Sequence, residues 1–468
     1  MQIIYIGIKN MIRKERSMEE LLYGRELLDS ELPQNVQEAI KEKPFKVEIT
    51  DSFTKQAGKY YCKRCQTIFT PVSKEHCICG EACGYCRNCL KLGKVRRCSH
   101  FYHLKEPNDF PIPKKEVLHW KGTLSEQQEK ASKDIVETIK KNQTRLLWAV
   151  TGAGKTEMLY EGIAYGLKNK KRIGIASPRI DVCLELAPRI KEAFPHTKIA
   201  VLYGGMEEEY RYTQLVIATT HQLYRFKEAF DVLIIDEVDA FPFHSNQSLF
   251  FAANKAKKKR SSLIYLSATP TLVMQKQVKN KKLLSTILPA RYHGHPLPVP
   301  KLKACWNWHE KLLKAPLRTP CGKKIQQLIK EERRFLIFIP NIEWMLKLEK
   351  KMRLVFPKCS FAFVSAEDTE RKAKVSAMRN KEFQFLMSST ILERGITFPN
   401  IDVLVIGAED GIFTESALVQ IAGRCGRAAD YPTGEVIFYH NGKSIAMKRA
   451  VKQIKQMNKL ARTRGLIQ

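Results

Sequence analysis

A loop of small residues that ends in a lysine and a threonine is the clearest chemical signal in the chain. The segment 149–156 reads AVTGAGKT and overlaps the end of the apolar run LLWAV at 146–150. Small residues let backbone N–H groups approach phosphate oxygens, while Lys155 neutralises the β and γ oxygens and Thr156 can bind Mg²⁺. Alanine stands where the consensus loop has its first glycine. The segment therefore predicts an ATP-binding loop formed by Thr151, Gly152, Ala153, Gly154, Lys155 and Thr156.

A pair of acidic residues follows a second apolar run later in the chain. The run DVLIID at 231–236 ends in Asp236, and Glu237, Val238 and Asp239 come next. In open α/β sheets, ligands bind at the carboxyl ends of the strands. We expect Asp236 to hold Mg²⁺ through water and Glu237 to act as the general base on the attacking water. An isolated acidic pair is ordinarily a solvated strand end, but the phosphate loop upstream favours catalysis.

The cysteines are concentrated in one stretch of the chain. Of the 13 cysteines, eight lie between residues 62 and 98. Two CxxC pairs, Cys62 with Cys65 and Cys86 with Cys89, form the pattern of a tetrahedral four-thiolate Zn²⁺ site. With no open coordination position indicated, this metal only stabilises a small domain. The remaining four are Cys77, Cys79, Cys83 and Cys98, and they either hold a second Zn²⁺, with His76 or His100 as further ligands, or are free thiols.

Two series of apolar runs must position these side chains. The first comprises 146–150, 172–177, 198–203, 215–220, 231–236 and 262–268, and the second comprises 335–340, 359–365, 383–389, 401–407 and 434–440. Each run has strand length and alternates with a stretch of helical pattern. This alternation predicts a parallel sheet covered by helices on both faces. The fold class is therefore α/β, with two such domains in tandem.

Charge indicates the class of partner. The 468 residues include 80 lysines and arginines against 48 aspartates and glutamates, a net charge of +32. Nucleic acid is the favoured partner of such an excess, ahead of acidic lipid headgroups or a basic surface that only confers solubility. Ordinary apolar and charged fractions exclude a mainly disordered chain. Because the N-terminus resembles no signal peptide and no run of about 18 apolar residues occurs, we expect a cytoplasmic protein.

Four further segments carry weaker expectations. The proline-containing stretches 105–115 and 289–300 are expected to be linkers. Residues 17–28 have helical spacing and form either a docking helix or part of a core. The basic run 255–260 is either a nucleic-acid contact or a solvated helix end. Near the C-terminus one helical face is expected to contact phosphate, and the alternatives are a solvated face or a membrane-surface helix. This face carries Lys448, Lys452, Lys455, Lys459 and Arg462.

In its motifs the chain resembles helicase superfamily 2. Motif I corresponds to Lys155 and Thr156, motif II to DEVD at 236–239, and motif III to SAT at 267–269. Motif V is similar to STILERGIT at 389–397, motif VI to QIAGRCGR at 420–427, and the element ahead of motif I to LSEQQ at 124–128. The resemblance covers about residues 120–440, with the motifs in order. It implies two RecA-like P-loop domains that hold ATP between them.

The resemblance also assigns roles to individual residues. It implies that Arg424 and Arg427 reach the γ-phosphate as arginine fingers and that Gln128 contacts adenine. Gly395 and Gln420 are implied to join the ATP site, and Ser267 and Thr269 to couple hydrolysis to motion. The segments 177–179 and 219–221 are implied to grip the sugar-phosphate backbone of the bound strand.

The four-cysteine unit ahead of this core resembles the ComFA family of late-competence proteins. The resemblance rests on Cys62, Cys65 and the segment YCRNCLKLGK at 85–94. The cysteines at 77, 79, 83 and 98 and Gln66 depart from the family pattern. The family implies a PriA-related core and a cytoplasmic ATPase of DNA uptake that single-stranded DNA stimulates. It also implies work at the inner face of the membrane beside the DNA-uptake channel, with ComFC and DprA as protein partners.

These inferences combine into one expected organisation. Residues 1–55 form an N-terminal segment, 56–104 the zinc-binding domain, 105–295 the first RecA-like domain, and 296–468 the second with the basic C-terminal helix. The expected function is an ATP-dependent single-stranded DNA translocase of competence. The alternatives are a duplex-unwinding PriA-like helicase of replication restart, a DNA-binding adaptor whose ATP site only gates assembly, and a zinc-stabilised RNA-remodelling protein.

Overall fold

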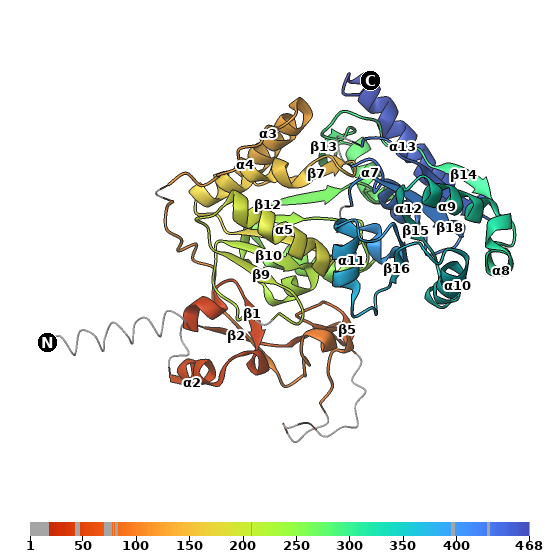
Figure 1. Ribbon diagram of the computed structural model, residues 1–468. Coiled ribbons are helices and arrows are strands. Elements are labelled where there is room, and N and C mark those ends of the chain that lie inside the picture. Colours follow the sequence, from red (N-terminus) through yellow and green to blue (C-terminus); the bar gives the residue numbers. More distant parts are fainter. Residues whose placement is uncertain are drawn as a thin grey trace, which may run out of the picture.

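The protein consists of two α/β domains with a smaller N-terminal unit packed against the first of them (Figure 1). The computed structural model describes residues 18–42, 47–69, 77, 79, 83–113, 115–206, 208–394, 398–427 and 431–467. Gly395, His76 and residue 17, which carried sequence-based expectations, lie outside these ranges.

The first α/β domain is built on a parallel sheet with strand order β13-β7-β12-β11-β8-β10-β9. Val, Ile and Leu fill its central strands, which are buried as expected for a sheet covered on both faces. Its strands are β7 (Thr144–Ala149), β8 (Ile173–Ser177), β9 (Ile199–Leu202), β10 (Leu215–Thr219), β11 (Phe230–Ile235), β12 (Lys257–Ser267) and β13 (Leu284–Leu288). Its helices are α3 (Glu126–Lys140), α4 (Lys155–Lys168), α5 (Ile180–Ala193), α6 (Gln247–Ala256) and α7 (Leu272–Lys279).

The second domain repeats this plan with strand order β14-β19-β18-β15-β17-β16, again with parallel pairing throughout. Its strands are β14 (Lys301–Ala304), β15 (Arg334–Phe338), β16 (Phe361–Val364), β17 (Phe385–Ser388), β18 (Ile401–Ile406) and β19 (Val436–His440). Its helices are α8 (Trp308–Lys314), α9 (Pro320–Lys330), α10 (Ile342–Val355), α11 (Arg371–Arg379), α12 (Glu415–Ala422) and α13 (Ile445–Thr463). The predicted tandem α/β architecture is therefore confirmed.

The sequence patterns missed one strand in each sheet. Both β13 and β14 are edge strands, and both are only partly buried. A strand whose side chains are partly exposed needs no continuous apolar run. Their sequences, LSTIL and KLKA, consequently lack the signal that identified the central strands.

The N-terminal unit contains two small antiparallel sheets. One has the order β1-β6-β2 and the other β3-β4-β5. The strands are β1 (Glu26–Leu28), β2 (Glu48–Asp51), β3 (Phe53–Gln56), β4 (Lys59–Cys62), β5 (Ile68–Phe69) and β6 (His100–His103), and α2 (Gln34–Glu42) packs beside them. The expected helix at 17–28 ends at residue 22 within the described ranges, and β1 follows it. Its apolar residues pack with α2 in a small core, so it is not a free docking helix.

Buried ion pairs attach the N-terminal unit to the first domain. The Arg172 guanidinium donates to Glu106 at 2.5 Å and to the Tyr23 carbonyl at 2.9 Å, and both charged side chains are fully buried. Glu106 belongs to the proline-containing segment 105–115, which packs on the domain surface; there Phe110 stacks on Tyr212 at 5.0 Å. The expected linker is therefore a fixed part of the interface.

The basic run 255–260 also contributes to this interface. It ends α6 and begins β12, so it is not simply a solvated helix end. Lys255 pairs with Glu26 of β1 at 2.5 Å, and Lys258 contacts Asp231 at 3.1 Å. Lys255 and Lys258 are therefore already paired with carboxylates of the protein, which argues against a nucleic-acid contact through these two side chains.

The C-terminal helix α13 spans the two α/β domains. Gln453 donates to the Ala268 carbonyl at 2.9 Å, and Arg464 beyond the helix donates to the Ile287 carbonyl at 2.7 Å. The five basic residues predicted to share one face are all exposed, on the side opposite the buried residues. Within the described ranges, no helix combines the length and apolarity needed to cross a bilayer.

Substitution of Glu106 by glutamine tests the attachment of the N-terminal unit. Loss of the carboxylate leaves the Arg172 charge buried and uncompensated, which costs about 3–5 kcal/mol in such pairs. We expect Glu106→Gln to lower the free energy of unfolding in urea by that amount. The matched control Glu129→Gln breaks only the exposed pair with Lys133 and should change stability by less than about 1 kcal/mol. Equal effects of the two substitutions would contradict this account.

Candidate nucleotide site, interdomain cleft and cysteine clusters

The phosphate loop connects β7 to α4 at the carboxyl end of the first sheet. Gly152 and Gly154 have φ values of 80° and 72°, a region that favours glycine, so the loop folds back and presents its backbone at the start of α4. The Gln128 amide donates to the Ala153 carbonyl at 2.9 Å and accepts from the Ser125 N–H at 2.8 Å. Gln128 lines the cavity and also supports the loop from below.

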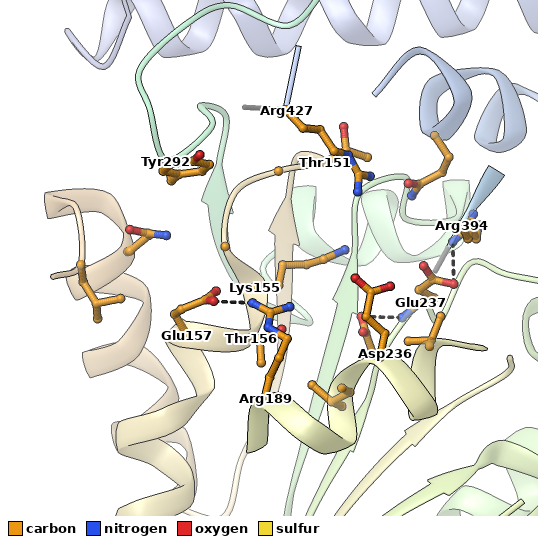
Figure 2. A pocket seen from close by; sticks show the side chains of 18 of the residues that line it. Thr151, Lys155, Thr156, Glu157, Arg189, Asp236, Glu237, Tyr292, Arg394 and Arg427 are labelled. Carbon is orange, nitrogen blue, oxygen red and sulfur yellow. Dashed lines mark hydrogen bonds and ion pairs between the residues drawn. The ribbon is translucent and has the colours of Figure 1, made fainter. Parts of the chain in front are cut away.

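The acidic pair lies directly opposite this loop. Asp236 follows β11, and Figure 2 shows its carboxylate facing the same cavity as Lys155. Burial raises the pKa of Asp236, and the nearby Lys155 ammonium acts in the opposite direction. A divalent cation at this position would favour the ionised carboxylate, so the chemistry of Asp236 and Thr156 fits Mg²⁺. Glu237 adopts a left-handed backbone with φ 52°, which makes a sharp turn after the strand.

Two arginines of the second domain complete the cavity. The cavity has a volume of about 510 Å³ and is lined by Arg424 and Arg427 together with Lys155, Asp236, Glu237 and Gln420. Burial lowers the pKa of both arginines, and their mutual repulsion acts on Arg424 in the same direction. The Nη1 atom of Arg424 is buried and has no hydrogen-bond partner among the described residues. The cavity therefore offers desolvated positive charge that fits a polyphosphate.

Nearly all residues predicted for the ATP site meet in this cavity. The residues that line it are Gln128, Thr151, Gly152, Gly154, Lys155, Thr156, Asp236, Glu237, Gln420, Arg424 and Arg427. Ala153 is buried behind the loop, with its carbonyl bonded to Gln128. Sequence reasoning missed Trp120 and Tyr292 at the cavity wall and the ion pair between Glu157 and Arg189. No local motif marks these residues, since only the fold brings them to the cavity.

Asp239 links the two domains beside the cavity. Its carboxylate accepts hydrogen bonds from Ser267 and Thr269 of the first domain, each at 2.6 Å. It also accepts from Ser416 of the second domain at 2.8 Å and from the Arg394 guanidinium. Burial alone would raise the pKa of Asp239, but Arg394 and these donors hold it far below its ordinary range. Sequence reasoning assigned no role to Arg394, although it lies in motif V.

The domains also approach closely at the phosphate loop. A Cβ atom added to Gly423, at the end of α12, would lie 1.9 Å from Thr151 Oγ1. Arg291 in the segment 289–300 is buried and donates to the Gly426 and Gly423 carbonyls. The segment expected to link the domains thus also fixes the motif VI loop against the first domain.

A second cavity of about 470 Å³ lies between the domains next to Asp239. Its lining includes Arg179, Phe241, His244, Thr269, Leu272, Thr390 and Gln453. Phe241 is 71% exposed, so its ring is available to a ligand. Of the residues expected to grip a strand, Ser177 and Thr220 are buried, while Arg179 pairs with Glu393 across the cleft.

The cysteines predicted to bind zinc converge. The Sγ atoms of Cys62, Cys65, Cys86 and Cys89 lie within 4.8 Å of one another. Cys62 is 3.9 Å from Cys89, and Cys65 is 3.5 Å from Cys86, measured between Sγ atoms. Four buried thiols at these separations fit a closed tetrahedral Zn²⁺ site. They pack in one hydrophobic core with residues of the first α/β domain, and Asn88 donates to Ser248 of α6 at 3.1 Å.

Comparison with family models divides the chain in the same order. A model described as the competence protein ComFA N-terminal domain matches residues 10–103. A model of the type III restriction enzyme res subunit matches residues 121–272, and one of the helicase conserved C-terminal domain matches residues 322–429.

Two curated relatives match almost end to end. Competence protein ComFA of Bacillus subtilis is 43% identical over 450 residues, which cover 95% of this chain and 96% of the relative. The ComFA protein of Streptococcus pneumoniae is 39% identical over 94% of this chain and 98% of its own length. Among solved structures, the DEAD-box helicase Mss116 bound to ssRNA has a TM-score of 0.55 and 19% identity, covering 71% of this chain and 77% of that one. At that identity the likeness supports the two-domain fold alone.

The contact between Gly423 and Thr151 gives a test of the closed arrangement. Gly423 has helical φ and ψ, so Gly423→Ala changes only the space available, and the new methyl group must push the domains apart. We expect faster amide hydrogen exchange in 150–156 and 420–427, measured by mass spectrometry. The matched control Gly411→Ala should leave exchange unchanged, because an added Cβ there has no neighbour within 4 Å. Unaltered exchange in both variants would mean that the domains do not meet at this contact.

Proposed function

Since the chain belongs to the ComFA family of competence proteins, we propose that it is an ATP-driven motor that moves along single-stranded DNA during DNA uptake. Its core is that of a superfamily 2 ATPase with helicase-like domains. The observation that carries the proposal is the interdomain cavity, where the phosphate loop faces two desolvated arginines of the other domain. In this arrangement the nucleotide controls the approach of the domains.

ATP binding rests on the residues of the phosphate loop. The backbone of Thr151, Gly152, Ala153 and Gly154 surrounds the phosphates, and Lys155 neutralises their oxygens. Thr156 and Asp236 would hold Mg²⁺, which neutralises charge on the β and γ phosphates when it is bound. Gln128 and Gln420 line the same cavity and contact the nucleotide, with Gln128 on the adenine side as the family motif implies.

Hydrolysis requires a base and a cationic clamp. Glu237 accepts a proton from water while the water oxygen bonds to the γ-phosphorus and the bond to the bridging oxygen breaks. Arg424 and Arg427 stabilise the charge that spreads over the transferring phosphoryl group. Gly395, the remaining residue assigned to the ATP site, lies outside the described ranges.

Release of the γ-phosphate changes the electrostatics of the cleft. When this phosphate leaves, Lys155 of the first domain and the two arginines of the second lose the anion that they share, which weakens the attraction across the cleft and favours opening. The hydrogen bonds at Asp239 couple this change to motif III and to α12. A strand that contacts both domains is then displaced with them.

The strand is proposed to cross the second cavity. Exposed Phe241 offers a stacking surface there, and the net charge of +32 attracts the phosphates. Stacking and phosphate contacts carry little base information, so movement along any sequence is expected. By analogy with the family, we propose that the protein works at the inner face of the cell membrane with ComFC, DprA and the uptake channel.

The ATPase activity tests the catalytic assignments. We expect ssDNA to stimulate hydrolysis strongly, and Lys155→Ala and Glu237→Gln each to reduce the stimulated rate by about 10²–10³-fold. Lys168→Ala and Glu192→Gln remove an exposed charge of the same kind from α4 and α5, and both should leave the rate near that of the wild type. Steady-state phosphate release measures all of these rates.

The choice of polynucleotide separates the proposal from its alternatives. Stimulation by RNA alone would favour RNA remodelling, and strand separation of a fork would favour a PriA-like helicase. Slow hydrolysis that no polynucleotide accelerates would contradict the motor and favour an adaptor.

Phe241→Ala tests the strand path. Loss of base stacking costs about 1–3 kcal/mol per base, so the ssDNA concentration for half-maximal stimulation should rise about 5- to 150-fold. Trp306 is another exposed ring, 62% accessible, but it does not line the second cavity. Trp306→Ala should therefore leave the half-maximal concentration unchanged. An unchanged value for Phe241→Ala would exclude this ring from the path.

A further inference from the structure

We propose that Cys77, Cys79, Cys83 and Cys98 bind a second Zn²⁺, separate from the site at Cys62, Cys65, Cys86 and Cys89. The four Sγ atoms lie within 4.8 Å of one another, and those of Cys77 and Cys98 are 3.7 Å apart. In a tetrahedral site with Zn–S bonds of about 2.3 Å, neighbouring sulfurs are about 3.8 Å apart. The cluster therefore has the number, type and separation of ligands for a closed Zn²⁺ site.

The backbone places Cys83 and Cys98 side by side. Tyr85 and Arg96 form an antiparallel bridge, and the Arg97 N–H donates to the Gly84 carbonyl at 2.9 Å. Cys83 and Cys98 follow directly at the end of this short ladder. The Cys86 N–H donates to the Val95 carbonyl at 2.9 Å in the same ladder. One backbone feature thus positions a ligand of the first site and two of the second.

The two sets of cysteines alternate along the chain. Cys62 and Cys65 belong to the first site, the next three cysteines to the second, Cys86 and Cys89 again to the first, and Cys98 to the second. The first metal therefore closes a long loop whose only cysteines are three ligands of the second site. A second ion held by these three cysteines and Cys98 would cross-link that stretch of chain to the segment after the first site.

Other uses of these thiols fit less well. A disulfide needs an S–S separation of about 2.05 Å and uses only two of the four cysteines, so it does not explain why all four converge. Four thiolates also leave no position for a catalytic water, which indicates a structural rather than a catalytic metal. Soft sulfur ligands select Zn²⁺ over Mg²⁺ or Ca²⁺.

The two sites differ in exposure. All four cysteines of the first site are buried, whereas Cys79 and Cys98 are exposed and Cys77 is half-buried. A metal at the second site is therefore accessible to chelators, while the first is enclosed by the core of the first α/β domain. We expect the second ion to be removed first.

Metal content tests the proposal on the full-length protein purified with zinc. The wild type should contain two Zn²⁺ per chain by mass spectrometry of the dissolved metal, and the double variant Cys77→Ser/Cys98→Ser should contain one. The matched control Cys359→Ser changes a half-buried thiol outside both clusters and should retain two. One Zn²⁺ per wild-type chain, or two in the double variant, would overturn the assignment.

Alkylation of the native wild type gives a readout that needs no variant to fold. Exposed thiols ordinarily react, so protection of Cys79 and Cys98 until a chelator is added would support metal ligation. Immediate alkylation of both before chelation would overturn it. Neither measurement involves ATP or DNA, so failure of the second zinc site and failure of the proposed motor would be distinguished.

Discussion

The carboxylate of Asp239 is the interaction on which the arrangement of the two α/β domains depends. It is buried, and it accepts hydrogen bonds from both domains: Ser267 and Thr269 on one side, Ser416 and Arg394 on the other. A buried charge of this kind is stable only while its partners stay in place. The distance between the domains therefore depends on the position of Asp239 in the motif II loop. Asp239 comes three residues after Asp236, whose carboxylate faces the nucleotide cavity.

The large positive charge of the chain has two distinct uses. Some cations stabilise the fold. Arg172 pairs with Glu106, Lys255 with Glu26 and Arg225 with Glu31, and these ion pairs attach the N-terminal unit to the first domain. Others line a cavity or a solvent face, as do Arg424, Arg427 and the exposed lysines of α13. Net charge alone suggested a polyanionic partner, but only the structure separates the cations that pair with carboxylates of the N-terminal unit and its linker from those that line a cavity or a solvent face.

The sequence was sufficient for what repeats or lies close together in the chain. Central strands of Val, Ile and Leu identified the two domains, which the family comparisons confirm. The contiguous loop at 151–156 lies, as predicted, in one cavity with most of the other residues assigned to ATP binding. The strands β13 and β14 were not predicted, because their side chains are partly exposed and their sequences therefore contain no apolar run. The sequence analysis also missed Arg394, Trp120 and Tyr292 as cavity residues, because only the folded chain brings these distant segments to one cavity. The basic run at 255–260 gave an ambiguous signal, since its partners Glu26 and Asp231 are remote or unmarked in sequence.

The position of α13 restricts how a competence-related, helicase-like motor of this shape can move. The helix belongs to the second domain, yet Gln453 is bonded to Ala268 and Arg464 to Ile287 of the first. These bonds keep α13, which lies beside both domains (Figure 1), attached to the first domain, and so they favour rotation of the two domains about the helix over their separation by translation. The displacement of one domain relative to the other is then smallest beside α13 and grows with distance from it, as in a lever whose fulcrum is this helix.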